Sequence, residues 1–591
     1  MEKRSCKNCK QDFSIEPDNF SFYEKIKVPP PTWCPACRFQ RRLLFRNERN
    51  YYRRMCGLCN RNIISTYFSE LPFPVYCQKC WWGDGWDPKS YGRDFDFNRT
   101  FAEQYKALQN VVPAVSIMND DGVASVNCEY TYDWAFSKNC YLGVCGWHVE
   151  NGLYMYCANY DKDVMDVWDV NYSELVYDSV NCDRCYGCKY CYLCFDSNNC
   201  AFGYDLKGCS NCVMCVGLRN KKYCISNKQY SKEEYEKEVE KLNLKSRANI
   251  EKCRKEFDKF IIQFPRKYTC IIKNMNSTGF LLTEAKNSKN CFYCSAPVEN
   301  CAYIVVNHGA KDSYDCNNTG MPELCYESVT PDNSRGNKFS IFCWKCTEAE
   351  YSNNCHSCVN VFGSIGLKHT SYAILNKQYS KEDFIDLRGK IIKHMKETGE
   401  WGEFFPYSVS PFAYNETAAM EWFPLKKEEA VSRGYRWKEN EKRNYTITKN
   451  PEELPDSIEQ VGDEILNEII GCEHAGGCNE KCTTAFKIVP NELNFYRMIN
   501  APLPTLCSNC RHYGRMARIN PPKLWKRKCM CADNTQTSAD FTQTNTDTPR
   551  YRNVAIHSHG EAACQNEFET SYAPDRPEIV YCESCYNSEI A

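Results

Sequence analysis

A short, regular pattern of apolar and polar positions fills the middle of the chain. From residue 173 the sequence falls into nine-residue blocks, SELVYDSVN, CDRCYGCKY, CYLCFDSNN, CAFGYDLKG and CSNCVMCVG. Cys182, Cys191, Cys200 and Cys209 share the first column, and aromatic residues fill most of the fifth. Stacked columns at a short period are typical of a parallel β-solenoid. We therefore expect short strands in coils of about 18 residues, two blocks to a coil, with Asn, Asp and Gly at the corners.

The repeat region is itself duplicated. SKNC at 137–140 recurs at 288–291, and NKQYSKE at 227–233 recurs at 376–382. The sequence therefore predicts two solenoids, at 126–228 and 266–378. Charged stretches with helical periodicity follow each of them, roughly at 230–260 and 379–398, and we expect these helices to cap the open ends of the solenoids.

Paired cysteines mark the beginning of the chain. Two Cys-x-x-Cys motifs at ribbon spacing make the first set, and a second set follows at once: Cys6, Cys9, Cys34 and Cys37, then Cys56, Cys59, Cys77 and Cys80. Two such motifs supply the four thiolates of a tetrahedral zinc site and leave no open coordination position. The sequence therefore predicts structural metal sites that do not catalyse a reaction.

The end of the chain carries a less regular version of the same arrangement. Its candidate ligands are Cys478, Cys482, Cys507 and Cys510 in one site, and Cys529 or Cys531 with Cys582 and Cys585 in the other. Cys472 and His474 compete for the first of these sites. His557, His559 or Cys564 could complete the last one.

Two longer matches connect the two ends. NFSFYEKIKVPPPTWCPACRFQRR matches ELNFYRMINAPLPTLCSNCRHYGR, and FPVYCQKCWW matches EIVYCESCYN. The shared pattern of CxxC, Phe-Tyr, Pro and then CxxC with Arg resembles the family described as probable zinc-ribbon or treble-clef domains. The resemblance implies a hairpin, then a helix that begins inside the second knuckle, and about four structural Zn²⁺ per chain.

Arginines follow the second Cys-x-x-Cys motif at both ends. On a helix they would share one face, and the candidates are Arg38, Arg42, Arg46, Arg49 and Arg53, with Arg511, Arg515 and Arg518 in the second copy. Such a stripe is typical of contacts with a nucleic-acid backbone, because guanidinium groups match phosphate oxygens. Two alternatives remain: the face docks on the acidic middle of the same chain, or it is only solvated.

Composition narrows the class of protein. The chain has 43 cysteines among 591 residues and a net charge of -1. The odd cysteine count, the charged start MEKRSCKNCK and the lack of a long apolar run predict an intracellular, cytoplasmic protein in a reducing compartment, with no signal peptide or transmembrane segment. No P-loop, HExxH or GxSxG motif occurs, so we do not expect an enzyme. The solenoid cysteines are core residues, ligands of a further metal or iron–sulfur cluster, or disulfide partners.

The fold class expected is multidomain and mainly β, with treble-clef or zinc-ribbon pairs flanking two solenoids. The expected parts are ribbons at 1–95, a connecting helix and linker at 96–125, the first solenoid with a helical segment at 229–265, the second solenoid with a helical segment at 379–400, an aromatic connector and acidic helix at 401–470, and ribbons at 471–591. We expect a non-enzymatic zinc scaffold that binds RNA or DNA. An assembly protein with protein partners and a metal-cluster or redox protein are the alternatives.

Overall fold

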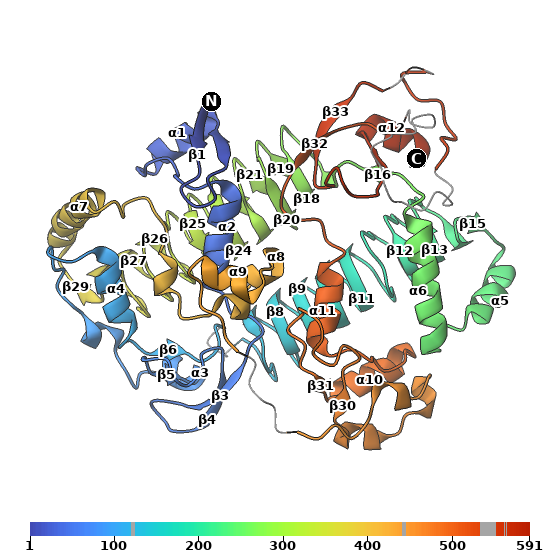
Figure 1. Ribbon diagram of the computed structural model, residues 1–591, viewed down its shortest axis with the longest axis horizontal. Helices are drawn as coiled ribbons and strands as arrows, with labels where there is room; N and C mark the ends of the chain where they lie inside the picture. The colour runs from blue at the N-terminus through green and yellow to red at the C-terminus, as the bar shows by residue number, and fades with distance from the viewer. Residues whose placement is uncertain (120–123, 440–444, 532–550, 561, 563, 591) are drawn as a thin grey trace. The chain divides into compact units, whose positions relative to one another are not determined.

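The computed structural model describes residues 1–119, 124–439, 445–531, 551–560, 562 and 564–590, and its strands and helices are drawn in Figure 1. The chain divides into two compact units. Unit 1 comprises Met1–Gly122, Thr269–Asn440 and Pro521–Lys523, and unit 2 comprises Val123–Tyr268, Glu441–Asn520 and Leu524–Ala591. Each unit therefore combines one cysteine-rich end of the chain with one of the two repeat regions.

Unit 2 contains a stack of short parallel strands, which we call stack A (residues 132–229). Its strands are β7 (Tyr132–Ala135), β8 (Tyr141–Trp147), β9 (Leu153–Asn159), β10 (Lys162–Asn171), β11 (Glu174–Asp183), β12 (Ala201–Tyr204), β13 (Ser210–Val216), β14 (Lys222–Ile225) and the antiparallel β15 (Lys228–Gln229). Successive strands pair in parallel from β7 to β11 and from β12 to β14, and isolated bridges such as Glu174 with Tyr186 lie between these two groups. The parallel partners are 12 residues apart, as in Lys162 with Glu174. The predicted coil of about 18 residues is therefore wrong.

A three-residue unit explains both the observed and the predicted period. Positive φ angles recur at every third position through much of stack A, as at Asn139 (56°), Leu142 (53°) and Cys145 (55°). The residue after each of these positions faces the core, as Cys140 does. Twelve residues hold four such triplets, and nine residues hold three. The nine-residue blocks therefore align inward-facing positions correctly but give the wrong number of residues per turn.

The inward positions of stack A are filled by small residues. Cys182, Cys185, Cys188, Cys191 and Cys194 are all buried, with exposed fractions of at most 2%. The Cys188 thiol donates to the carbonyl oxygen of Tyr186, two residues earlier (3.6 Å). Ser197 occupies another inward position of stack A, and its hydroxyl donates in the same way to Phe195 (2.9 Å). Cysteine and serine are thus used alike here, as small core residues that also satisfy a backbone carbonyl.

Unit 1 contains the corresponding stack B (residues 271–378). Its strands are β17 (Ile271–Ile272), β18 (Gly279–Thr283), β19 (Ala285–Lys286), β20 (Cys291–Cys294), β21 (Val298–Glu299), β22 (Val305–His308), β23 (Ala310–Lys311), β24 (Tyr314–Gly320), β25 (Tyr326–Val329), β26 (Thr347–Glu350), β27 (Val359–Phe362), β28 (Ser371–Ile374) and the antiparallel β29 (Lys377–Gln378). The parallel partners are again mostly 12 residues apart, as in Tyr314 with Tyr326.

Helices follow both stacks, as expected from the sequence pattern. In unit 2 these are α5 (Lys232–Leu242) and α6 (Arg247–Ile261), and in unit 1 the helix is α7 (Lys381–Glu397). Ser231 caps α5 and Ser380 caps α7, because each side chain accepts a hydrogen bond from the backbone N–H three residues later. The acidic helix expected before the C-terminal cysteines is replaced by three 3-10 turns, at Pro451–Glu453, Ile458–Gln460 and Asp463–Asn467. Pro455 and Gly462 interrupt any longer helix.

The cysteine-rich ends consist of small hairpins and short helices. The N-terminal elements are β1 (Glu2–Ser5), β2 (Asp12–Ile15), α1 (Pro17–Lys25), α2 (Pro35–Leu43), β3 (Tyr52–Met55), β4 (Asn62–Ser65), β5 (Val75–Tyr76), α3 (Gln78–Trp82), α4 (Phe101–Gln109) and β6 (Ala114–Val115). The C-terminal elements are β30 (Ile470–Gly471), β31 (Ala485–Phe486), α10 (Pro490–Ile499), α11 (Ser508–Met516), β32 (Trp525–Lys528), β33 (Glu567–Thr570), β34 (Val580–Tyr581) and α12 (Glu583–Ile590). The remaining short elements are the 3-10 turns at Pro88–Tyr91, Tyr407–Val409 and Tyr414–Glu416, with α8 (Ala419–Trp422), α9 (Lys427–Ser432) and β16 (Arg266–Lys267). The hairpin before the second knuckle is the short pair β1–β2, and α1 follows it.

Candidate metal centres and the arginine contacts behind them

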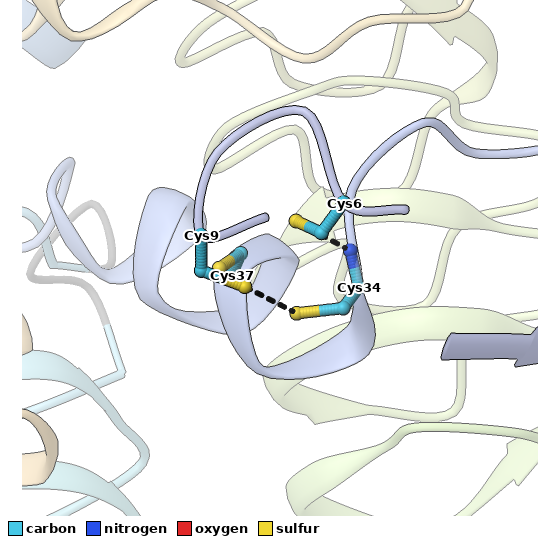
Figure 2. Close-up of side chains that lie close together, drawn as sticks. All are labelled: Cys6, Cys9, Cys34 and Cys37. Carbon is cyan, nitrogen blue, oxygen red and sulfur yellow. Dashed lines mark hydrogen bonds between the residues drawn. The ribbon is translucent and has the colours of Figure 1, made fainter. Parts of the chain in front are cut away.

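The first four predicted ligands converge at one point (Figure 2). The sulfur atoms of Cys6, Cys9, Cys34 and Cys37 all lie within 4.8 Å of one another, and the Cys9 and Cys34 sulfurs are 3.8 Å apart. Four thiols at this spacing could hold one metal ion. The donor set therefore fits a closed four-coordinate site.

Local backbone geometry positions these thiols. Cys6 directly follows strand β1, and its N–H donates to the carbonyl oxygen of Gln11 (2.9 Å). Lys10 adopts a positive φ of 63°, which turns the chain into β2. Cys34 is the N-cap of α2, and its N–H donates to the sulfur of Cys6 (3.2 Å). Such N–H···S bonds favour the charged thiolate, the form that binds a metal.

The second predicted set repeats this geometry. Cys56, Cys59, Cys77 and Cys80 form another group with sulfur atoms within 4.8 Å. Cys77 caps α3, and its N–H donates to the sulfur of Cys56 (3.3 Å). Burial alone would raise the pKa of Cys56, but backbone N–H groups of Cys59 and Cys77 lower it to about 6. In the first set, a hydrogen bond from Cys37 lowers the pKa of Cys34 to about 5.

The same N–H···S bond identifies the first cysteine of each C-terminal group. The N–H of Cys507 donates to the sulfur of Cys472 (3.3 Å), and the N–H of Cys582 donates to the sulfur of Cys529 (3.2 Å). The groups that the structure brings together around these bonds are Cys472, Cys482, Cys507 and Cys510, and Cys529, Cys564, Cys582 and Cys585. In each, the second cysteine stands three residues before the return strand of the hairpin, as Cys9 does.

This correspondence favours two of the alternatives that the sequence left open. Cys472 takes the place given to Cys478, although the Cys478 sulfur still lies 3.7 Å from that of Cys510. Cys564 takes the second position of the last group. Spacing alone could not decide between these alternatives, because the first knuckle is enlarged in each C-terminal copy, from two residues between the cysteines to nine and to 34. The segment between Cys529 and strand β33 therefore contains an insertion, and residues 532–550, 561 and 563 of that segment lie outside the described residues.

Cys531 and His559 lie beside the last group and make a second set with two of its members. Cys531, His559, Cys564 and Cys585 also have their donor atoms within 4.8 Å of one another. His559 Nε2 is 3.3 Å from the Cys531 sulfur and 3.4 Å from the Cys585 sulfur. His557 instead bonds Glu589 (2.7 Å). The sequence left Cys529 and Cys531 as alternatives. In the structure each belongs to one of the two overlapping ligand sets that share Cys564 and Cys585.

The arginines behind the first knuckle lie buried against stack B. Helix α2 contacts β24 and β25 (Figure 1), and there Arg38 Nη2 is 2.8 Å from Asp315 Oδ2. Arg42 Nη1 lies 3.2 Å from the other Asp315 oxygen, and Arg42 Nε donates to Asn317 (3.1 Å). Burial alone would lower the pKa of Arg38, but the charge of Asp315 outweighs it and raises the pKa well above its usual value.

Further arginines extend this buried network. Arg41 Nη2 donates to both carboxylate oxygens of Glu327 (2.8 and 2.9 Å), and Arg41 Nη1 donates to Glu403 (3.0 Å). Helix α2 ends at Leu43, but Arg46 remains buried and pairs with Glu48. Further contacts in unit 1 are those of Arg46 with Thr330 and of Arg49 with Glu421 (3.7 Å).

The corresponding helix of unit 2, α11, makes the equivalent contact with stack A. It contacts β10 and β11, where Arg515 Nη1 is 2.9 Å from Asp166 Oδ1 and Arg511 Nε is 3.4 Å from Asp166 Oδ2. Arg511 also pairs with Glu492 of α10 (3.2 Å). Asp166 and Asp315 are 149 residues apart, the same distance as between the two copies of NKQYSKE at 227 and 376. Helix, arginines and acidic partner therefore form a contact that occurs twice.

These contacts correct the predicted exposed arginine stripe. Arg38, Arg42, Arg46 and Arg515 are at most 2% exposed, and Arg49 is 6% exposed. In this arrangement their guanidinium groups do not face solvent, so they cannot line an open nucleic-acid surface. Two other candidates remain at least partly accessible. Arg53 is exposed, but it lies on strand β3 and not on the predicted helix, and Arg518 is partly buried.

The sequence missed the acidic partners of these arginines. Asp166, Asp315 and Glu327 are each at most 1% exposed and sit at positive-φ positions of the stacks. The sequence did contain a signal for one of these partners. Asp166 lies within the largely apolar strand segment DVMDVWDV, and a carboxylate buried there requires a charged or hydrogen-bonding partner.

Comparisons with known proteins leave these sites without a family assignment. No protein-family model matches the chain, and no curated protein is significantly similar to it. The cysteine groups are the part of the zinc-ribbon and treble-clef resemblance that the structure supports. Within the described ranges, every helix is too short or too polar to cross a membrane.

Proposed function

We propose that this chain is a non-enzymatic, zinc-dependent scaffold in which each cysteine-rich module anchors a β-solenoid. Four thiolates at tetrahedral spacing favour Zn²⁺, because soft sulfur ligands and a closed site suit a structural zinc ion. The modules would be treble clefs, since in three of the four groups the third cysteine stands at the beginning of a short helix as its N-cap. The two stacks would be solenoids with four three-residue sides per coil.

One observation carries this proposal. At each end of the chain, the helix that begins at a four-cysteine group also delivers two arginines to a buried aspartate of a stack, Asp315 in unit 1 and Asp166 in unit 2. A metal ion that holds the beginning of such a helix therefore also fixes the arginines that bind the stack. Metal binding and stack stability are expected to be linked for this reason.

The link can be tested with Cys34→Ser, which removes one ligand of the first group. We expect zinc content to fall by about one ion per chain, because a three-thiolate site loses most of its affinity. Amide exchange should become faster in α2 and in β24 and β25. A matched control is Cys188→Ser in the core of stack A, where serine can make the bond that Ser197 makes and zinc should be retained. Equal zinc contents in the two variants would contradict the proposal.

The alternative of a redox or metal-cluster role for the core cysteines has less support. A metal ligand must be a thiolate, whereas the Cys182, Cys188 and Cys191 thiols donate hydrogen bonds to carbonyl oxygens two residues earlier. Protein partners remain a prediction. Nucleic-acid binding also remains a prediction, now resting on exposed cations such as Arg53, Lys526 and Lys528.

A further inference from the structure

Unit 2 contains a cavity of about 240 Å³ beside the outer surface of stack A. Tyr192 and Tyr204 of the stack form one wall, Arg254 and Phe257 of α6 form another, and Arg518 and Tyr572 of the C-terminal module close it. All the residues that line it belong to unit 2.

The charges around this cavity are unbalanced. Four arginines line it, Arg254, Arg266, Arg518 and Arg576, against two carboxylates, Asp258 and Glu578. Arg254 is paired with Asp178 (2.7 Å), and Arg576 Nε donates to Glu578 (3.1 Å). Two positive charges, those of Arg266 and Arg518, are left without a carboxylate at ion-pair distance among the described residues.

Arg266 is almost fully buried, with an exposed fraction of 4%. Its guanidinium lies over the ring of Tyr204 (3.9 Å), and Nη2 donates to the Ile261 carbonyl (2.7 Å). Nη1 has no hydrogen-bond partner within the part of the chain that the structure describes. A buried donor without a partner is costly, so a partner from outside the chain would relieve that cost.

Arg518 is the second unpaired cation. Its side chain makes no ion pair or hydrogen bond with any described residue, and burial lowers its pKa, although the charge of Asp178 opposes this. The counterpart of Asp178 in unit 1 is Glu327, since the two are 149 residues apart, and Glu327 is bound by Arg41. In unit 2 the residue that corresponds to Arg41 is Gly514, which has no side chain to bind Asp178. Arg254 of α6 binds Asp178 instead. Arg518 is thus left without a carboxylate.

We propose that this cavity binds a small phosphate-bearing ligand, held by Arg266 and Arg518 and stacked through a planar group on the aromatic wall. Phosphate oxygens match guanidinium donors, and two unpaired arginines balance the charge of a phosphate monoester. Tyr190, Tyr192, Tyr204 and Phe202 supply the apolar surface for a ring. Aromatic walls with a few convergent polar groups are typical of small-molecule sites.

Titration calorimetry with phenyl phosphate tests this site on the full-length, zinc-loaded protein. We expect saturable binding at one site, about tenfold or more tighter than that of inorganic phosphate, because the ring packs on the aromatic wall. Zinc content is measured after each titration, so that metal loss is not mistaken for binding. Absence of saturable binding would overturn the proposal, and equal affinities for the two probes would remove the stacking role of the wall.

Arg518→Gln is the informative variant, because the side chain has no partner among the described residues to lose. We expect an unchanged or higher melting temperature without ligand and about tenfold or greater loss of affinity for phenyl phosphate. The matched control is Arg184→Gln, which removes an exposed arginine of stack A paired with Asp196 (2.6 Å). Unchanged affinity in Arg518→Gln, or an equal loss in Arg184→Gln, would show that Arg518 does not anchor the ligand.

Discussion

Single backbone hydrogen bonds define the metal groups at the residue scale. In all four groups, the N–H of the third cysteine donates to the sulfur of the first, over distances of 3.2 to 3.3 Å. This bond depends on the fold of the hairpin and the following helix, and it is independent of the number of residues in the first knuckle. It therefore identifies Cys472 and Cys529 where Cys-x-x-Cys spacing alone does not.

The third group provides a direct test at this scale. Cys482→Ser should lower zinc content by about one ion per chain, since Cys482 is the second of the four cysteines brought together in that group. Cys478→Ser should leave zinc content unchanged, because the other four thiols complete the site without it. Elemental analysis of the two purified variants distinguishes them. Loss of zinc in Cys478→Ser as well as in Cys482→Ser would restore the assignment made from spacing, in which both cysteines are ligands.

Part of this detail was available in the sequence. The eight N-terminal cysteines could be grouped because each pair has the regular Cys-x-x-Cys spacing, and the structure brings both sets together. The C-terminal groups could not be completed, because an enlarged knuckle removes the spacing signal and leaves Cys472, Cys478 and Cys482 equivalent in sequence.

Buried ion pairs hold the elements together at the next scale. Arg42 is fully buried and lies between Asp315 and Asn317, so neither charge has water as an alternative partner. Breaking such a pair from one side leaves an uncompensated charge, which typically costs about 3 to 5 kcal/mol.

Asp315→Asn therefore should destabilise unit 1 strongly, by about 3 kcal/mol or more, because Arg38 and Arg42 both lose their nearest carboxylate and keep only Glu327, at 3.9 Å from each. Chemical denaturation followed by tryptophan fluorescence measures the change. The exposed Arg61→Gln is the control, with an expected change within about 0.5 kcal/mol. A loss in Asp315→Asn no larger than in the control would mean that the α2 contact contributes little to stability.

A second buried pair links α7 to stack B and makes stability depend on pH. Glu350 accepts from Arg388 Nη2 (2.8 Å) and Lys338 Nζ (3.2 Å). Burial by itself would raise the pKa of Glu350, but Lys338 and Arg388 outweigh it and hold the pKa below its usual value. A carboxylate with a lowered folded-state pKa stabilises the fold above its unfolded pKa of about 4.3, and that contribution is lost as the pH falls through the folded value.

The melting temperature of the wild type should therefore fall below about pH 4.3 partly through Glu350. Glu350→Gln should melt at a lower temperature at neutral pH and show a smaller further decrease in acid. Parallel melting curves of both proteins between neutral and acid pH provide the measurement. An identical decrease in both would exclude Glu350 as a source of the acid sensitivity.

The period of the stacks shows why sequence patterns predict elements only in part. The nine-residue blocks predicted parallel strands and inward-facing columns, because both depend on the three-residue unit. The number of residues per turn depends on how four triplets close around the core. The columns of Cys182 to Cys209 do not determine that number, because any multiple of three residues would place the same positions inward.

At the scale of the whole molecule, the chain consists of two units of similar construction. The N-terminal module belongs to the same unit as the second repeat region, and the C-terminal module to the same unit as the first. The order of segments along the chain does not predict this, because both repeat regions contain the matching aspartate, Asp166 or Asp315, 149 residues apart. Each module could have bound either stack by this criterion alone.

The central claim is that metal ions, held by the cysteine groups, maintain both units. Elemental analysis of the full-length protein, purified without oxygen and without added metal, tests it most directly. We predict about four zinc ions per chain, one for each four-cysteine group, with no iron and no acid-labile sulfide. Iron with stoichiometric sulfide, or a folded protein that contains no zinc, would contradict the account.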